Sequence, residues 1–295
     1  MRPVIETEGL TKHFGSIRAL EDLTFAVMPG EVFGFLGPNG AGKTTTIRLL
    51  LDFLRPTRGR ARLLGGSGAD PAIRRRVGYL PADLPIDPRY TAQDLIDFYG
   101  ALRGGVEAGW VRELLRRFEL DATRPVGELS TGNRRKVGIV QSVIHRPELL
   151  ILDEPTAGLD PLLQQEFGVL VREIAGDGTA VLLSSHVLPE VEELASRVAI
   201  LRRGRLVTVA AVSDLREQAR QRITLRLAAT ADPAPFAAIP EVVEATADGA
   251  VLRLVVEGSV DRVVKAAGAF DVLRLSVQEA DLEDVFLGYY EDDAS

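Results

Sequence analysis

The sequence predicts an α/β protein with a mostly parallel sheet in its larger part and a smaller α+β part after it. Two continuous apolar runs, 149–153 and 180–184, are typical of strands buried on both faces of a parallel sheet, and a helical pattern separates them. Beyond about residue 210, short stretches appear in which apolar and polar residues alternate. This change predicts two domains, 1–210 and 211–295.

The first 175 residues supply further strands and helices of the larger part. Residues 1–35 are typical of short strands, interrupted by turn residues at Gly15 and at the Pro29–Gly30 pair. Thr91 and Asp94 form a capping-box pattern that predicts the start of a helix. Helices are predicted at 44–54, 91–120, 133–145 and 161–175.

The C-terminal part has the pattern of a small sheet with its own helices. A connecting helix is predicted at 212–221, and alternating strands are predicted at 223–227, 252–256 and 273–277. Apolar residues at helical spacing predict a further helix at 260–267. The resulting order, roughly β-α-β-β-α-β, is that of a split β-α-β domain.

Composition narrows the class of protein. The chain has 295 residues, 46% of them hydrophobic and 26% charged, so it can bury a core. Its net charge of −7 argues against binding nucleic acid, and its lack of cysteine excludes disulfides and thiolate chemistry. The apolar stretches are shorter than the ~20 residues of a membrane span, and the N-terminus lacks the apolar core of a signal peptide. We therefore expect neither export nor membrane insertion.

A glycine-rich stretch between a predicted strand and a predicted helix has the spacing of a phosphate-binding P-loop. The pattern G-x-x-x-x-G-K-[ST] runs from Gly37 to Thr44. Glycines let backbone N–H groups turn inward around phosphate, and the helix that follows adds its positive end. Lys43 is expected to bridge the β- and γ-phosphates, and the Thr44 hydroxyl to ligate Mg²⁺. The residues predicted to contact the nucleotide are Gly37, Pro38, Asn39, Gly40, Ala41, Gly42, Lys43, Thr44 and Thr45.

Two acidic residues follow the first buried apolar run. Asp153 and Glu154 stand at the carboxyl end of the predicted strand, which is the edge where ligands bind in open α/β sheets. Asp153 is expected to help hold Mg²⁺, and Glu154 to orient or deprotonate the attacking water. In isolation the same pair could be two solvated acids at a strand end.

Together with the P-loop, further segments make residues 1–210 resemble the ATP-binding cassette (ABC) family. "LSTGNRRKV" resembles the family's signature, "LDEPTAGLDP" its Walker B segment and D-loop, and "LLSSH" its switch-histidine segment. More narrowly, the chain resembles the ATPase subunits of ABC-2-type exporters, because "LEDVFLGYY" looks like the closing helix of the small domain that many of them carry.

The resemblance implies a fold and further site residues. The fold is a P-loop NTPase-type ABC cassette with an N-terminal antiparallel β subdomain and a helical signature subdomain at about 82–146, followed by a ferredoxin-like C-terminal domain. Phe14 is expected to stack on adenine, although alone it could equally be a core residue. Ser130, Gly132 and Asp160 are expected to act on ATP across a cassette dimer, and His186 to contact the γ-phosphate and the water. Without a partner, Ser130 would simply cap a helix.

The chain departs from the family pattern at three positions. Thr131 and Asn133 replace the usual Gly and Gln of the signature, while Ser130 and Gly132 are kept. Ala82 stands where the family usually has glutamine, and its methyl group can neither ligate Mg²⁺ nor position water. The neighbouring segment "PADLPIDP" is expected to form a groove for a coupling helix of the membrane partner.

The resemblance implies ATP hydrolysis that powers a separate membrane permease, and the likeness to the ABC-2 subgroup implies that this permease is an exporter. Two copies of the chain, or the chain and a paralogue, would enclose two ATP–Mg²⁺ and part when the γ-phosphate leaves. Such a subunit lies in the cytoplasm, on the inner face of the membrane through the permease, and binds no nucleic acid. Two alternatives stay open: a nucleotide-gated regulatory or binding subunit with little hydrolysis, and a soluble ABC ATPase outside transport.

Overall fold

A computed structural model describes residues 2–218 and 220–278 of the chain. It divides into two compact units, with the boundary between Val209 and Ala210. Each unit has its own hydrophobic core. The segment "LEDVFLGYY", for which a closing helix is expected, lies outside the described residues.

The larger unit is built around a mainly parallel sheet with the strand order β5-β6-β7-β3-β8-β9. The pairs β5–β6, β6–β7, β7–β3 and β3–β8 are all parallel. The predicted apolar runs form β6 and β7, whose side chains are buried on both faces, as expected for central strands. The strands are β3 (Val32–Leu36), β5 (Val77–Leu80), β6 (Leu149–Asp153), β7 (Ala180–Ser185), β8 (Arg197–Arg202) and β9 (Arg205–Ala211).

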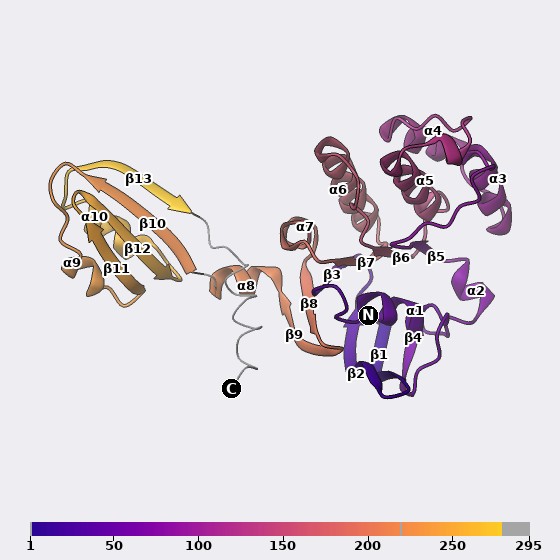
Figure 1. Cartoon of the computed structure of the whole chain (residues 1–295), viewed down its shortest axis with the longest axis horizontal. Coiled ribbons are helices and arrows are strands. Elements are labelled where there is room, and N and C mark those ends of the chain that lie inside the picture. Colours follow the sequence, from indigo (N-terminus) through magenta and orange to yellow (C-terminus); the bar gives the residue numbers. More distant parts are fainter. Residues whose placement is uncertain (1, 219, 279–295) are drawn as a thin grey trace. The chain divides into compact units, whose positions relative to one another are not determined.

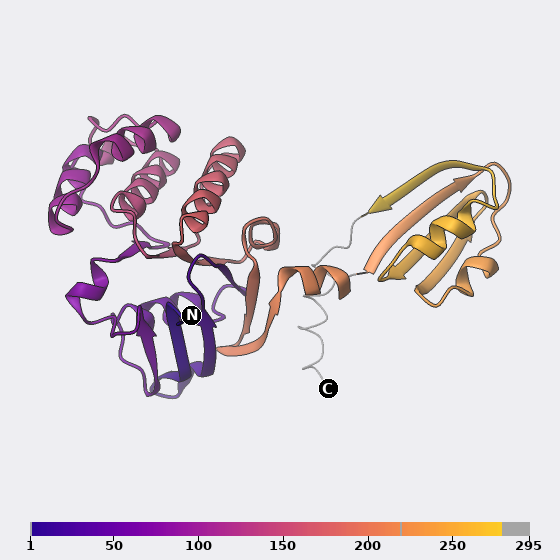
Figure 2. The ribbon, with the colours of Figure 1, turned by 180° about the vertical axis from the view of Figure 1, so that it is seen from behind.

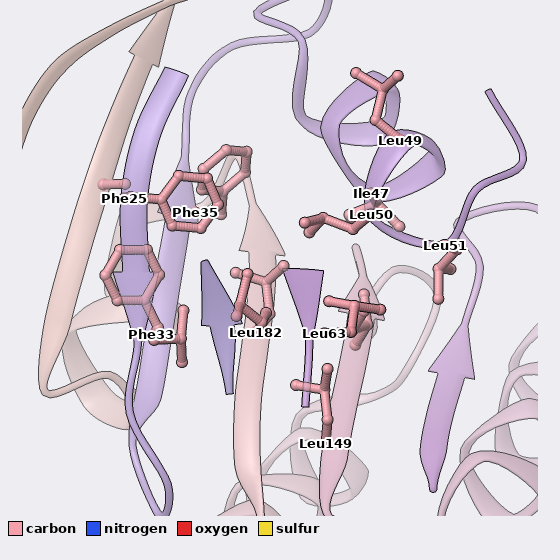
Figure 3. Close-up of a cluster of buried hydrophobic side chains, with 14 of the residues drawn as sticks. Phe25, Phe33, Phe35, Ile47, Leu49, Leu50, Leu51, Leu63, Leu149 and Leu182 are labelled. Carbon is pink, nitrogen blue, oxygen red and sulfur yellow. The ribbon is translucent and has the colours of Figure 1, made fainter. Parts of the chain in front are cut away.

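A second, antiparallel sheet of order β2-β1-β4 and helix α1 cover one face of this main sheet (Figures 1 and 2). The core lies between these layers, where Phe25 of β2 stacks on Phe33 of β3 with ring centroids 5.6 Å apart. Figure 3 shows this cluster, with Phe35 and Leu182 beside the two rings and α1 to their right. The elements are β1 (Ile5–Phe14), β2 (Ile17–Val27), β4 (Arg58–Leu63) and α1 (Lys43–Leu50).

Helices cover the opposite face of the main sheet, as Figure 1 shows. The predicted capping box of Thr91 and Asp94 is formed at the start of α3. The predicted helix at 91–120 is wrong in one respect, because the chain breaks at Gly104 and Gly105, whose φ values of 87° and 112° do not fit a helix. The helices on this face are α3 (Ala92–Leu102), α4 (Ala108–Arg117), α5 (Thr131–Val143), α6 (Pro161–Gly176) and α7 (Leu188–Leu194), with a 3₁₀ turn at Val126–Glu128. Helix α2 (Pro71–Arg74) lies on the side of α1, and its Ile73 joins the core there.

The smaller unit has an antiparallel sheet of order β11-β12-β10-β13, which is the order of a split β-α-β fold. Its core includes Ile223, Leu252, Phe236 and Val263, so strands and helices both contribute. The alternating pattern at 273–277 does form a strand, but Leu273 is 67% exposed rather than half-buried. The elements are α8 (Val212–Gln218), β10 (Arg220–Leu227), α9 (Ala234–Ala237), β11 (Val242–Asp248), β12 (Val251–Glu257), α10 (Asp261–Ala267) and β13 (Val272–Gln278).

Candidate nucleotide-binding site

The glycine-rich loop joins the end of β3 to the start of α1, as its sequence context predicts. Two of its glycines are required by close packing. A Cβ on Gly37 would lie 2.5 Å from the carbonyl oxygen of Leu201, and one on Gly42 would lie 2.4 Å from the Leu20 side chain. Gly42 also has φ 110°, a conformation that other residues rarely adopt. Because both Cβ atoms would clash with β8 and β2, glycine is needed at these positions for the loop backbone to form a cradle at the start of α1.

Helix α1 points its free amides into this cradle. Its first intrahelical bond runs from the Thr46 amide to the Gly42 carbonyl, 2.9 Å, so the amides before it have no acceptor within the helix. No side chain caps this end. Free N–H groups at a helix N-terminus, together with the helix dipole, attract anions. The combination of cradle and helix start suits a phosphate group.

Lys43 is the first residue of α1 and its side chain turns back over the loop. The side chain is only 6% exposed. Its ammonium nitrogen Nζ donates a hydrogen bond to the Gly37 carbonyl, 2.5 Å, and lies 3.2 Å from Oε1 of Glu154. One cation is thus held between the phosphate cradle and an acidic residue from the end of β6.

Asp153 ends β6 and is fully buried. Its Oδ2 accepts a hydrogen bond from the Thr44 hydroxyl, 2.9 Å, and its Oδ1 accepts one from the Ser184 hydroxyl, 2.5 Å. Hydroxyl and carboxylate oxygens are the protein ligands that Mg²⁺ prefers. Thr44 and Asp153, brought together from two elements at one edge of the sheet, therefore fit a magnesium ion.

Glu154 directly follows the strand and turns towards Lys43 and His186. Its φ of 50° is in the left-handed region, which non-glycine residues seldom adopt. The Glu154 amide donates to the Ser184 carbonyl, 3.1 Å, and its Oε2 lies 2.7 Å from Nδ1 of His186. The other oxygen, Oε1, is buried and has no hydrogen-bond partner among the described residues. His186 thus fixes Oε2, while Oε1 makes no hydrogen bond and is ion-paired with Lys43.

Phe14 ends β1 with its ring 46% exposed, so it is not a core residue. The ammonium group of Lys12 lies 5.0 Å from the ring centroid. In the next strand, β2, the Leu20 side chain packs against Gly42 of the loop, which connects this edge of the antiparallel sheet with the phosphate cradle. An exposed aromatic face near such a cradle is available for stacking.

Ser130, Gly132 and Asp160 do not join the Lys43–Glu154–His186 cluster among the described residues. The Ser130 hydroxyl accepts the amide of Asn133, 3.2 Å, at the start of α5, and the Asp160 carboxylate accepts the amide of Leu163, 3.0 Å, at the start of α6. A Cβ on Gly132 would lie 2.9 Å from the Gly158 carbonyl, so these two helix starts are close to each other. Within one chain both side chains act as helix caps.

Two residues of the site were not predicted from the sequence. Ser184 holds both the carboxylate of Asp153 and the amide of Glu154, and its place at the end of an apolar strand is the signal that could have identified it. Arg135 is buried on α5 and donates hydrogen bonds to backbone carbonyls beside Asp153. Its position within a run of basic residues offers no comparable signal.

A groove of about 350 Å³ lies between α3, α5 and the segment that follows β5. Pro81, Leu84, Pro85 and Ile86 of the proline-rich segment form part of its wall, together with Tyr79. Burial, and secondarily the charge of Asp153, raise the pKa of Tyr79 to about 12, so its hydroxyl keeps its proton at neutral pH. The wall is largely apolar. Ala82 has an exposed side chain, whereas its carbonyl is bonded to Arg135, 3.0 Å.

Within residues 2–218 and 220–278, every helix is too short or too polar to cross a bilayer.

Comparisons with known proteins agree with this geometry. Residues 20–157 match the ABC transporter family. The chain is 32% identical to the bacitracin transport ATP-binding protein BcrA of Bacillus licheniformis over 97% of both chains. It is 35% identical to the Nod factor export ATP-binding protein I of Ralstonia nicotianae, in a match that covers 70% of this chain and 66% of that protein.

A solved structure of an ATP-binding subunit of an ABC transporter superposes on 73% of this chain with a TM-score of 0.69 and 32% identity. That superposition covers 92% of the solved chain. The order of motifs, the site geometry and a relative aligned over almost its entire length all agree. The chain belongs to the ABC transporter family as an ATP-binding subunit.

Proposed function

We propose that this chain hydrolyses ATP and thereby drives a separate membrane permease. The observation that carries the proposal is the cluster at the edge of the main sheet, where Lys43 and His186 hold the two carboxylate oxygens of Glu154 next to the Thr44–Asp153 pair. A phosphate cradle, a magnesium-type oxygen pair and a positioned carboxylate are the parts that phosphoryl transfer to water requires.

In this proposal, one set of residues binds the nucleotide and another transfers the proton of the attacking water. The loop amides and Lys43 bind the phosphates, and the ring of Phe14 stacks on the adenine. Thr44 and Asp153 are the residues that would hold Mg²⁺, which neutralises phosphate charge when bound. Glu154 takes the proton of the attacking water at Oε1 once the phosphates draw Lys43 away from that oxygen, while His186 holds Oε2.

We infer that the working unit is a pair of cassettes, formed by two copies or by the chain and a paralogue. Ser130 and Asp160 use only part of their hydrogen-bonding capacity as helix caps, and Gly132 lies beside them, so the three remain available to a nucleotide held by a second cassette. Cross-pair contacts to the γ-phosphate would give the closed state its differential affinity for ATP.

Export is the direction that the relatives favour, because the names of two of them describe bacitracin transport and Nod factor export. The apolar groove beside the proline-rich segment is the surface we assign to the permease, which places the subunit on the cytoplasmic side of a membrane. Purification of the chain from its native membranes should recover a polytopic membrane protein, identified by mass. Recovery of the chain without any membrane protein would contradict this assignment and favour an ATPase outside transport.

The test of hydrolysis is Glu154→Gln, which removes the proton acceptor and keeps the shape. We expect phosphate release to fall by about 100-fold or more while ATP binding persists. Glu148→Gln is the matched control, since Glu148 lies at the opposite end of β6 in an exposed pair with Arg76 and should leave the rate unchanged.

Equal rates in Glu154→Gln and the unaltered chain would remove Glu154 from the reaction. An unaltered chain that binds ATP and releases no phosphate would instead favour the nucleotide-gated regulatory subunit.

A further inference from the structure

One buried arginine lies between the candidate catalytic site and the candidate permease groove. Arg135 is in the second turn of α5 and is only 5% exposed. Its Nε donates to the Pro155 carbonyl, 2.9 Å, and its Nη2 donates to the carbonyls of Asp153, 2.8 Å, and Glu154. Its Nη1 donates to the carbonyls of Pro81, 2.7 Å, and Ala82, 3.0 Å. One guanidinium thus binds two chain segments that are far apart in the sequence.

The arrangement depends on carbonyl groups rather than on an ion pair. Among the described residues, no carboxylate is hydrogen-bonded to Arg135. Burial lowers its pKa, whereas the charges of Asp153, Glu154 and Asp83 raise it. A buried cation is costly unless its N–H groups are satisfied, so the carbonyls around Arg135 are held in place by the same contacts that stabilise the charge.

On the catalytic side, these contacts fix the backbone on both sides of Glu154. The carbonyls of three successive residues, 153–155, converge on the guanidinium. Glu154 itself has a φ of 50°, a conformation that is unfavourable for an L-residue and persists only where the surroundings enforce it. Its carboxylate direction, towards Lys43 and His186, follows from that backbone.

On the groove side, the same guanidinium holds the first residues of the wall. Pro81 lines the groove, and its carbonyl and that of Ala82 both accept from Nη1. One turn further along α5, Gly138 packs tightly against Leu80 and Leu84, where a Cβ would lie 2.7 Å and 2.8 Å from their methyl groups. The side chain of residue 82 is an exposed methyl group and makes no such link.

We propose that Arg135 is the positioning residue that couples the groove to the catalytic carboxylate. A displacement of the wall at 81–84 moves the guanidinium and with it the peptide groups that aim Glu154, and nucleotide acting at Glu154 moves the wall in return. This inference rests on the proposed function, because it assigns the groove to the permease and the proton transfer to Glu154. The methyl group of Ala82 cannot link the groove to the catalytic site, and in this proposal Arg135 makes that link through backbone carbonyl groups.

The first test is Arg135→Lys, which keeps the charge and loses the planar set of donors. We expect kcat for ATP to fall by about tenfold or more with KM changed by less than about twofold, because misaiming Glu154 affects the transition state and leaves the phosphate cradle intact. Arg117→Lys is the matched control. Arg117 is 11% exposed and binds Glu166 and Glu173 on α6, so its loss should lower stability and leave kcat unchanged.

The second test is hydrogen exchange in segment 82–86 of the full chain, at the amides of Ala82, Asp83, Leu84 and Ile86, with and without a non-hydrolysable ATP analogue and Mg²⁺. We expect the analogue to alter exchange there by about twofold or more in the unaltered chain and in Arg117→Lys, and to leave it unchanged in Arg135→Lys. This measurement distinguishes coupling from a merely structural role, because the analogue binds at the other end of the link.

A wild-type kcat in folded Arg135→Lys, or an exchange response at 82–86 that survives in that variant, would overturn the inference. If Arg135→Lys does not fold, hydrogen exchange in the unaltered chain still tests the proposal. Exchange at 82–86 that is the same with and without the ATP analogue would refute the coupling. Failure of the proposed function has a different signature: the unaltered chain would release no phosphate, whatever the state of Arg135.

Discussion

At the scale of single residues, the site consists of polar groups that fix one another before any ligand arrives. Asp153, fully buried, depends on hydroxyl donors from two other elements, Thr44 and Ser184. Sequence motifs predicted Lys43, Thr44, Asp153, Glu154 and His186, and the structure brings these five together at one edge of the sheet. Arg135 could not be predicted, because helical periodicity gives no information about carbonyls from distant segments.

Ser184→Ala tests the support of Asp153. The change leaves Oδ1 buried without its donor, and such a loss typically costs about 1–3 kcal/mol. We expect the free energy of unfolding, measured in urea, to fall by that amount. Ser67→Ala is the control, since Ser67 is exposed and accepts only a local turn bond from Ala69. An unchanged midpoint in Ser184→Ala would show that Asp153 does not need this donor.

His145 gives the chain a predictable dependence on pH. Burial, with help from the neighbouring charge of Arg103, lowers its pKa from 6.5 to about 4. The unfolded chain therefore takes up this proton first, and stability present above pH 6.5 is lost as the pH falls towards about 4.

Between about pH 7.5 and 5.5, this group alone should remove about 1 kcal/mol from the free energy of unfolding. His145→Gln should lose correspondingly less over the same interval in urea titrations. An identical loss in both proteins would mean that His145 is not the group responsible.

At the scale of elements, local patterns predicted where helices start better than where they end. The capping box fixed the start of α3, whereas the break before α4 depends on Gly104 and Gly105, which apolar spacing alone does not reveal. Burial on β13 was also not predictable: Leu275 lies opposite fully buried Leu225 and is nevertheless 42% exposed. Alternation indicates which residues share a face and cannot indicate how far the covering layer extends.

Two glycines test how closely elements approach. Gly78 of β5 faces α5, and a Cβ there would lie 2.1 Å from the Ser142 carbonyl, so Gly78→Ala should destabilise the fold by about 1–3 kcal/mol. Gly176 ends α6 with open space around the corresponding position, so Gly176→Ala should be neutral or stabilising by up to about 1 kcal/mol. Thermal unfolding of both variants checks the contrast, and a similar loss in each would contradict it.

At the scale of the whole molecule, the two cores make separate unfolding the expected behaviour. The single tryptophan of the chain, Trp110, belongs to α4 in the larger unit and reports on that unit alone. Phe236 is fully buried in the smaller unit, with its ring 5.4 Å from that of Phe270. The sequence pattern changes near residue 210, and the boundary between the two compact units lies between Val209 and Ala210.

Phe236→Ala should cost the smaller unit about 3–5 kcal/mol, because a large buried side chain leaves a cavity. Circular dichroism should then show a transition at lower urea concentration, while the transition followed by Trp110 fluorescence stays where it is. A joint shift of both signals would mean that the two parts of the chain unfold as one cooperative body.

Because of the ion pair between Lys43 and Glu154, nucleotide binding also prepares the catalytic base. One ammonium group cannot fully satisfy a phosphate and a carboxylate at once, so an arriving nucleotide competes with Glu154 for the same charge. Nucleotide binding therefore draws the ammonium group of Lys43 towards phosphate and frees the Glu154 carboxylate to act as a base.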